Sequence, residues 1–361
     1  MGIFGKLFNS KIGQKIKNEF GIGEDQQNIR TIKTVPSDIQ DLLLISVSER
    51  YQVGQKEFPS SFRTEYGVND PAHQLIALAE NGFIRSATAK ESLGHLKMDK
   101  LKEIANQYDL KPCKQKDELC KKIADVVPDD ALENIADIRY WKITEKGRDA
   151  LNKNSFISYY TSSHSYDLNN VDIDINRLYE LVRNNPDKRI RDLVWGEYNR
   201  KSMECFEEAT KTGNFRTYCK LLEDMAFFLS EEGRYKDALA AYIKYIYYAF
   251  NYDAGLSALQ NYSRSKKIND SAEILFLYAG SHSIEGYRIN GWSNSCDFDK
   301  KQLQAFIEET FDKYPGGLLS SKDLTDYVFA RINENEEKEK SLCRKAIRDA
   351  AKELPKYMKS R

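Results

Sequence analysis

Apolar residues recur at helical spacing along most of the chain. The stretch 36–51 has apolar side chains at positions 39, 42, 43 and 47, with Ser37 as a capping residue, which predicts a helix. A second, short helical piece is expected between Pro59 and Gly67. Two short helices therefore begin the part of the chain with a clear hydrophobic pattern.

A third helix has clear signals at both ends. Asp70 is placed to cap it and Pro71 to occupy its first turn, while Asn81–Gly82 form a stop. Its predicted apolar face consists of Leu75, Ile76 and Leu78. The residues Phe83 and Ile84 then begin a strand, so the predicted order is three helices followed by a strand.

A second strand is expected only at 139–144, where Tyr140, Trp141 and Ile143 favour extended structure and Thr144 caps another helix. The segments LIALAENGFI and YWKITEKGRDAL resemble the two flanks of the wing in bacterial winged-helix proteins. The resemblance implies that Ile84 and Tyr140 lie in neighbouring strands and that the residues between them form an inserted module. Separate small helical modules are the alternative interpretation.

Two short amphipathic runs fill that interval, in LKMDKLKEIANQYDLKPCKQKDELCKKIA (96–124). The first run presents Met98, Leu101, Ile104 and Tyr108 on one face, and the second presents Leu119 and Ile123. Leu110 is placed to fill the space between them, and Pro112 keeps the connection extended. About 35 residues bury little surface, so the two helices are expected to cross closely and to pack against a neighbour.

This pattern resembles the SAP domain, a helix–extended–helix module that binds DNA. The matching residues are Met98, Leu101, Ile104, Leu110, Lys116, Glu118, Leu119 and Ile123. Asp109 and Lys114 depart from the pattern, because the family favours glycine at both places; Asp tolerates a left-handed backbone better than Lys does. The overall layout resembles SAP-domain proteins of Gram-positive bacteria and their phages.

The distribution of charge limits how far the chain can be interpreted as DNA-binding. The chain has 55 Lys and Arg against 55 Asp and Glu, so any affinity for phosphates must come from a local cluster. Residues 91–125 contain eight lysines and seven acids, whereas residues 110–122 contain five lysines and two acids. The resemblance implies DNA contacts by Lys97, Lys100, Lys111, Lys114, Lys116, Lys121 and Lys122. A solvated lysine face on an interaction module is the alternative.

The spacing of apolar residues predicts helices throughout the second half of the chain. One is expected within 171–185, and one over 192–206 with apolar anchors at Leu193, Val194, Trp195, Tyr198, Met203 and Phe206. The segment 217–250 then reads as two helices joined at Glu232–Gly233–Arg234. This hairpin resembles a tetratricopeptide repeat at Leu222, Ala226, Leu229, Gly233, Tyr235, Ala238 and Tyr242. It departs from that family at Tyr245 and Phe250.

Two features of the helical half have alternative interpretations. The tyrosines at 242, 245, 248 and 252 follow helical spacing, so we expect a packing surface and not a base-stacking platform. The tail from Ile332 is a charged helix with few core positions. It is expected to be either a solvated surface helix or an oligomer contact.

No active site or metal site emerges from the sequence. His164 and His282 each have serine neighbours, but adjacency in sequence is not the geometry of a catalytic triad. Asp172 and Asp174 are more typical of helix caps than of a catalytic pair. The six cysteines form no CxxC pair, and no phosphate-binding glycine motif occurs. The chain is therefore expected not to be an enzyme, with no catalytic residues, metal or cofactor, and to reside in a reducing cytoplasm.

The beginning of the chain, MGIFGKLFNSKIGQKIK, carries four lysines and no acid. Phe4, Phe8, Ile12 and Ile16 follow helical spacing, with Lys11 and Lys15 on another face. A mobile tail, a helix packed on its own domain and a membrane-surface helix are all compatible with this pattern, which lacks the long apolar core of a signal peptide. No segment is long and apolar enough to predict a membrane span.

The predicted class is mostly α. The expected divisions are a basic segment at 1–30, a winged-helix-like domain at 31–90 plus 130–153, a SAP-like insert at 91–128, an all-α domain at 165–332 and a charged helix at 333–361. The leading functional expectation is a DNA-binding protein whose helical half binds protein or associates with itself. A protein-interaction scaffold that does not bind nucleic acid is the alternative.

Overall fold

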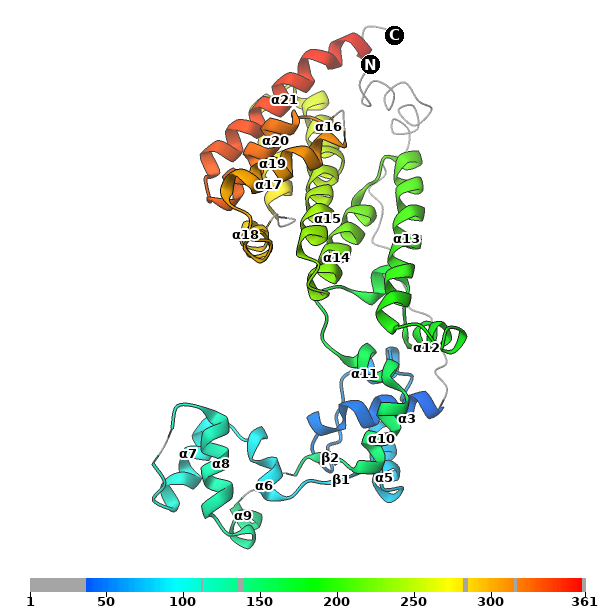
Figure 1. The fold of residues 1–361 in the computed structure, drawn as a ribbon, viewed down its shortest axis with the longest axis vertical. Helices are drawn as coiled ribbons and strands as arrows, with labels where there is room; N and C mark the ends of the chain where they lie inside the picture. The colour runs from blue at the N-terminus through cyan, green and yellow to red at the C-terminus, as the bar shows by residue number, and fades with distance from the viewer. Residues whose placement is uncertain (1–36, 112, 136–138, 282–284, 315–316, 359–361) are drawn as a thin grey trace. The chain divides into compact units, whose positions relative to one another are not determined.

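The computed structural model describes residues 37–111, 113–135, 139–281, 285–314 and 317–358. Within these ranges the chain is mostly α-helical, and its sheet has two strands (Figure 1). Contacts divide the described chain into two compact units, one formed by 37–163 with 174–190 and the other by 164–173 with the residues from 191 onward. None of the helices described combines the length and the apolar character needed to cross a membrane.

The N-terminal unit begins with three helices, α3 (Ser37–Val47), α4 (Ser61–Thr64) and α5 (Pro71–Glu80). The Asp70 carboxylate accepts the His73 N–H at 3.0 Å, so the predicted cap of α5 is confirmed. Leu75 and Leu78 are buried, but Ile76 is 50% exposed, and its assignment to the apolar face was wrong. The packed stripe of α5 is therefore narrower than its sequence indicates.

The two strands, β1 (Ile84–Ser86) and β2 (Trp141–Ile143), pair antiparallel with Ile84 opposite Ile143. The Ala87 N–H donates to the Tyr140 carbonyl at 2.8 Å, so the chain leaves the sheet and returns to it at the same point. An isolated bridge from Gln52 to Tyr140 adds one more extended segment. The expected pairing of these two distant strand segments is confirmed.

Gly147 allows the chain after β2 to pack closely against Phe83, just before β1. Helix α10 (Glu145–Lys153) begins at Thr144, whose side chain accepts the Gly147 N–H at 3.2 Å. A Cβ at position 147 would lie 2.2 Å from the Phe83 carbonyl oxygen, closer than any real contact. Only glycine lets the first turn of α10 approach the beginning of β1 so closely.

Between the strands the chain forms four helices, α6 (Ala89–Ser92), α7 (Met98–Gln107), α8 (Lys116–Val126) and α9 (Asp129–Ile135) (Figure 1). We call residues 89–132 the insert. Its core consists of Ala89, Leu93, Leu101, Ile104, Ala105, Leu119, Ile123, Val127 and Leu132. All of these residues belong to the insert itself, so α6 and α9 supply the neighbour that two crossing helices required.

The N-terminal unit is completed by α11 (Ser155–Thr161) and α12 (Ile175–Asn184). The rings of Phe156 and Tyr179 lie 5.5 Å apart between these helices. Helix α12 therefore packs with the N-terminal unit, not with the helical half in which the sequence pattern placed it.

The second unit begins with a short turn, η3 (Leu168–Val171), and continues with α13 (Ile190–Thr212). Leu193, Val194 and Tyr198 are buried as expected. Met203 and Phe206 are 68% and 37% exposed, so their assignment as anchors was wrong. The buried position after Met203 is Ala209; Met203 lies toward solvent, and the partly exposed ring of Phe206 lies 5.1 Å from Tyr218.

The core of this unit contains a hairpin of α14 (Arg216–Glu231) and α15 (Tyr235–Tyr248). Gly233 adopts a φ of +72° at the turn, a conformation that favours glycine. Ala226 and Ala238 are fully buried, which fits close packing of the two helices. Where a tetratricopeptide repeat usually has proline, Phe250 lies in a π-helical turn, η4 (Ala249–Ala254), and the chain continues directly into α16 (Gly255–Ser265).

Five further helices complete the unit: α17 (Ile268–Ser281), α18 (Gly286–Ser295), α19 (Lys300–Asp312), α20 (Ser321–Ile332) and α21 (Glu336–Met358). Helix α21 packs against α16, α17 and α20. Its buried residues include Leu342, Cys343, Ala346 and Ile347. The expectation of a solvated helix with few core positions was therefore wrong, because one face of the charged tail completes the core of its own unit.

Candidate nucleic-acid interface

The connection between α7 and α8 is held by the core of the insert. Leu110 packs against that core, and its N–H donates to the Ala105 carbonyl at 2.9 Å. Asp109 adopts a φ of +50°, as expected from its glycine-like place in the pattern. Lys114 is not among the described residues with positive φ, so the lysine at the second such place carries no left-handed strain. Pro112 lies outside the described residues.

The beginning of α8 is open to a ligand. Gln115 is extended and makes no capping hydrogen bond through its side chain. The first backbone N–H groups of the helix therefore lack a side-chain acceptor, and they carry the positive end of the helix dipole. Asp117 and Glu118 lie in the same turn and partly offset that positive charge.

The seven candidate lysines differ in their surroundings. Lys97, Lys111, Lys114 and Lys121 are exposed, and no ion pair is formed by any of them within the described part of the chain. Lys100 pairs with Glu103 at 3.0 Å, and Lys122 pairs with Glu118 at 2.8 Å. Both pairs are exposed, and such pairs contribute little and are readily exchanged for another anion. Lys116, the first residue of α8, is half-buried.

A basic junction joins the insert to the sheet, and we define it as Lys116, His95 and Lys142. The His95 ring stacks on Tyr140 at 3.9 Å and 14°. Burial lowers the pKa of His95, and the nearby charges of Lys116 and Lys142 lower it further, while Glu49 opposes them. Lys142 also pairs with Glu49 at 3.2 Å.

The sequence analysis missed His95 and Lys142, because nothing local connects them to Lys116. The one available signal was the predicted pairing of the strands. That pairing returns the chain to the base of the insert at Tyr140, the residue on which His95 stacks.

Helix α5, the third helix before the sheet, lacks the side chains of a phosphate-binding surface. It contains no lysine or arginine, and its exposed residues are His73, Ile76 and Glu80. Phosphate contacts come mainly from Lys and Arg. The insert is therefore a better candidate for contact with a nucleic-acid backbone than α5.

The residues considered for catalysis have structural partners. The Ser165 hydroxyl donates to Glu231 at 2.6 Å, and His164 Nδ1 lies 3.4 Å from the same carboxylate. The Ser165 hydroxyl thus donates its hydrogen bond to the Glu231 carboxylate. In a catalytic triad the serine would donate to the imidazole instead. His282 lies outside the described residues. In the described ranges, no cluster of three or more His, Cys, Asp or Glu could hold a metal ion.

The paired aspartates of the sequence are also explained by local structure. Asp174 caps α12 by accepting the Arg177 N–H at 2.8 Å. Asp172 accepts from the Lys201 ammonium group at 2.6 Å. The prediction that this pair serves the following helix is confirmed for Asp174.

Two carboxylates with strongly raised pKa values lie on α14, and sequence patterns did not indicate them. Burial, with repulsion from Asp224, raises the pKa of Glu223 to about 7, and burial raises the pKa of Asp224 to about 6. Asp224 accepts hydrogen bonds from Asn170 at 2.5 Å and from the Asp167 N–H at 3.4 Å. These bonds fix η3 against α14, so Asp224 has a structural role.

Aromatic residues of the helical unit form a packed cluster. Tyr242, Tyr245, Tyr248 and Tyr252 are all less than 10% exposed. Rings buried to this degree cannot stack on bases, so the expectation of a packing surface is confirmed.

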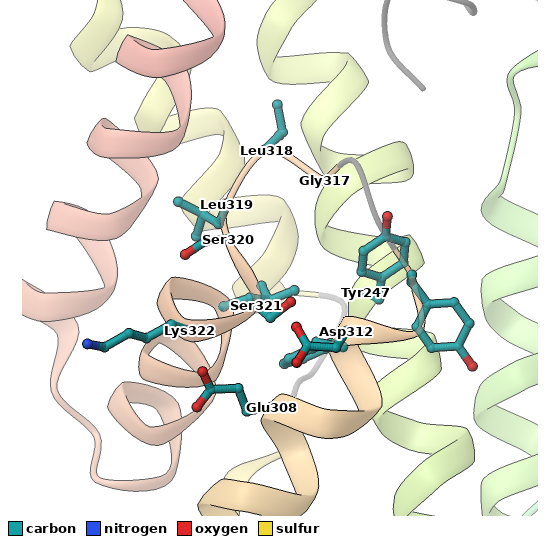
Figure 2. Close-up of a pocket in the computed structure, with 12 residues that line it drawn as sticks. Tyr247, Glu308, Asp312, Gly317, Leu318, Leu319, Ser320, Ser321 and Lys322 are labelled. Atoms are coloured by element: carbon teal, nitrogen blue, oxygen red, sulfur yellow. The ribbon is translucent and has the colours of Figure 1, made fainter. Parts of the chain in front are cut away.

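A cavity in the helical unit has a volume of about 560 Å³ and lies between α19 and the beginning of α20. Figure 2 shows Glu308 and Asp312 of α19 on one side and Ser321 and Lys322 of α20 on another. Its size suits a small ligand. Its lining mixes acidic, basic and apolar side chains, so it defines no ligand class.

Comparison with known proteins gives no relative: no family model, no curated protein and no solved structure matches this chain. The function is therefore argued from the residues of the site alone.

Proposed function

We propose that this chain is a non-enzymatic DNA-binding protein, in which the insert contacts the duplex backbone and the helical half makes protein contacts. The observation that carries the proposal is the lysine-rich connection of the insert, which leads directly into the uncapped beginning of α8. Backbone N–H groups at a helix N-terminus, surrounded by ammonium groups, attract a phosphate.

The layout of the insert supports its interpretation as a SAP-like module. Two amphipathic helices flank a short extended connection, and Leu101, Leu119 and Ile123 of the motif are fully buried. The left-handed backbone at Asp109 stands where the family favours glycine. The resemblance thus extends from the sequence pattern to the buried positions and to one special backbone conformation.

The surrounding domain is proposed to be winged-helix-like. Three helices precede the antiparallel pair of β1 and β2, which the insert interrupts, and the bridge from Gln52 to Tyr140 adds an extended segment between the first and second helices. With no basic residue on α5 other than His73, this domain acts in the proposal as a scaffold. It presents the insert and contributes Lys142 to the basic junction.

For the helical half, we propose protein binding or self-association. The hairpin of α14 and α15 keeps the small residues and the glycine turn of a tetratricopeptide-like unit. Such hairpins commonly serve as contact surfaces for other proteins.

Salt dependence tests the proposal. Binding to a random-sequence duplex, followed by fluorescence anisotropy, is expected to weaken steeply between about 50 and 200 mM salt, because each phosphate contact releases counterions. The variant with Lys114, Lys116, Lys121 and Lys122 changed to Glu should lose binding to every duplex alike. Single Lys→Gln changes should each lower the slope of log affinity against log salt by about 1.

A matched control changes Lys188, Lys211, Lys236 and Lys313, outside the insert, to Glu. This variant has the same net charge as the first and should retain most of the affinity. Equal loss in both variants would mean that net charge, not the insert, determines binding. Unchanged affinity in the first variant would refute the insert as the DNA contact.

The alternative is a protein-interaction scaffold that does not bind nucleic acid. Asp117, Glu118 and Asp125 accompany the lysines of α8, and Val126 at its end is 54% exposed. An acidic and apolar surface of this kind suits a protein partner. The same experiment separates the two functions, since the scaffold would show no duplex binding even at low salt.

A further inference from the structure

Polar contacts surround the point at which the insert joins the sheet. On one side, the Arg85 guanidinium of β1 donates two hydrogen bonds of 2.7 Å to the carboxylate of Glu91 on α6. A bidentate pair of this kind fixes the orientation of both groups, which a single hydrogen bond does not. The same carboxylate accepts the Thr88 N–H at 2.9 Å, so it also belongs to the cap of α6.

A second acid connects the other side of the insert to the sheet. Glu133 of α9, directly after the insert, accepts the Ala89 N–H of α6 at 3.2 Å and pairs with Arg139, two residues before β2. The Arg139 guanidinium also donates to the Glu133 carbonyl at 3.3 Å. Between the two helices, Lys90 pairs with Asp129 at 2.7 Å. The ends of the insert are therefore joined to the strands and to each other.

The strands close these contacts into a ring. The Ala87 N–H donates to the Tyr140 carbonyl at 2.8 Å, and β1 pairs with β2 directly beside this bond. The contacts thus run from β1 through α6 and α9 to β2 and back to β1. We call their four charged members the base ring: Arg85, Glu91, Glu133 and Arg139.

The base ring differs from the ion pairs on the surface of the insert. The pair of Lys122 with Glu118 joins two residues one turn apart in a single helix. Exposed pairs of that kind contribute little, whereas bidentate pairs and networks contribute more. The hydrogen bonds from Arg85 lower the pKa of Glu91 to about 2, so this carboxylate stays charged at neutral and mildly acidic pH.

The core of the insert does not explain how the insert is oriented on the sheet. That core is formed by residues of the insert alone. The orientation therefore depends on contacts outside the core, namely the base ring and the stack of His95 on Tyr140.

We propose that Glu91 and Glu133 are positioning residues, which hold the insert in one orientation on the sheet so that its lysines meet the duplex together. The part that concerns the lysines rests on the proposed function. A fixed orientation favours binding, because a loosely attached element must lose conformational freedom when several of its groups bind at once.

The variant with Glu91→Gln and Glu133→Gln isolates this role. Glutamine suits the same place in a capping box and keeps an acceptor for both backbone N–H groups, so α6 should stay folded. It has no charge with which to hold the arginines. In the full-length protein, hydrogen exchange followed by mass spectrometry should show several-fold faster exchange at residues 87–89. Exchange at the core residues 101–105 should not change.

Duplex affinity, measured by anisotropy, gives a second result whose sign is informative. If charge alone acted, removal of two acids near a lysine cluster would strengthen the attraction to phosphates. Loss of positioning should instead weaken binding several-fold. The matched control, Glu103→Gln with Glu118→Gln, removes the same charge from pairs within single helices. It should strengthen binding and leave exchange at 87–89 unchanged.

A further variant, Arg85→Lys with Arg139→Lys, keeps the net charge of the protein. Lysine is a point charge and cannot form two parallel hydrogen bonds with one carboxylate, so it removes the bidentate geometry. Both measurements should change in the same directions as in the glutamine variant, and by less.

Unchanged exchange at 87–89 in the glutamine variant would overturn the proposal, and so would an affinity that rises as in the control. If the wild-type protein bound no duplex at all, the proposed function would fail and the role of positioning the lysines with it. The exchange rates would still decide whether the base ring holds the insert. Faster exchange at 87–89 with an unchanged core, together with weaker binding, is the result that supports the proposal.

Discussion

The insert and the α14–α15 hairpin are both built on paired helices, but they use their residues in opposite ways. The insert buries nine small aliphatic residues and leaves its lysines in water. The hairpin buries large aromatic residues, including Tyr242 and Phe228, and embeds Ala226 and Ala238 between its helices. The insert therefore offers a charged surface on a minimal core, whereas the hairpin offers stability and a fixed shape.

The difference indicates where changes should act. Substitutions on the surface of the insert should alter binding with little effect on stability. Substitutions in the hairpin should alter stability with little effect on binding.

The largest effect is expected from removal of residues 90–132 and their replacement by a Gly-Ser bridge. Because Ala87 and Tyr140 are joined by a hydrogen bond, the strands should close without the insert, and a change in loop length costs little. Duplex affinity should fall by about a hundredfold or more, since most phosphate contacts are lost. The melting of the remaining protein, followed by circular dichroism, should stay cooperative.

Unfolding of the N-terminal unit in that deletion would show that the insert and the sheet share one cooperative core. The stack of His95 on Tyr140 is one contact that would be responsible. The contrast between a surface module and a stable scaffold would then not hold for this unit.

Ala238→Leu should have a smaller effect, and on stability alone. Ala238 is fully buried between α14 and α15, so three additional carbon atoms should cost about 1–3 kcal/mol through overpacking. Chemical denaturation measures this loss, and duplex affinity should not change. Ala240→Leu is the control, because Ala240 is half-buried and a longer side chain there can extend toward solvent. Equal stability of the two variants would mean that the hairpin is loosely packed at Ala238.

Features set by neighbouring residues could be predicted from the sequence. The caps at Asp70 and Thr144 and the turn at Gly233 follow from residue types that satisfy particular backbone groups. The pairing of β1 with β2 could also be predicted, although the strands are far apart in sequence. Two short strands with no other partner leave unpaired backbone groups unless they pair with each other.

Features set by distant packing could not be predicted. Met203 and Phe206 look like core residues, yet Ala209 is the residue that α13 buries in this part of the helix. Helix α21 looks solvated because charged residues surround its buried positions, such as Cys343 and Ile347. For the candidate site, the lysines were visible in the sequence, but the basic junction required knowledge of which residues meet across the sheet.

The smallest expected effect is a pH dependence of DNA binding through His95. Its pKa is lowered by burial first and then by Lys116 and Lys142, so the free protein resists protonation of this ring. The stability that the neutral ring contributes is present above its unfolded pKa and is lost as the pH falls. A duplex phosphate held by Lys116 would have the opposite influence, because a nearby anion raises the pKa of a histidine.

The complex should therefore take up a proton that the free protein does not, and affinity should rise a few-fold as the pH falls from about 7.5 to about 5.5. His95→Asn should remove most of this rise, while His73→Asn, on the exposed face of α5, should leave it intact. Anisotropy titrations at constant ionic strength measure both. If affinity falls with decreasing pH in the wild type, or if the two variants behave alike, phosphates do not approach the basic junction and the DNA contact is confined to the far side of the insert.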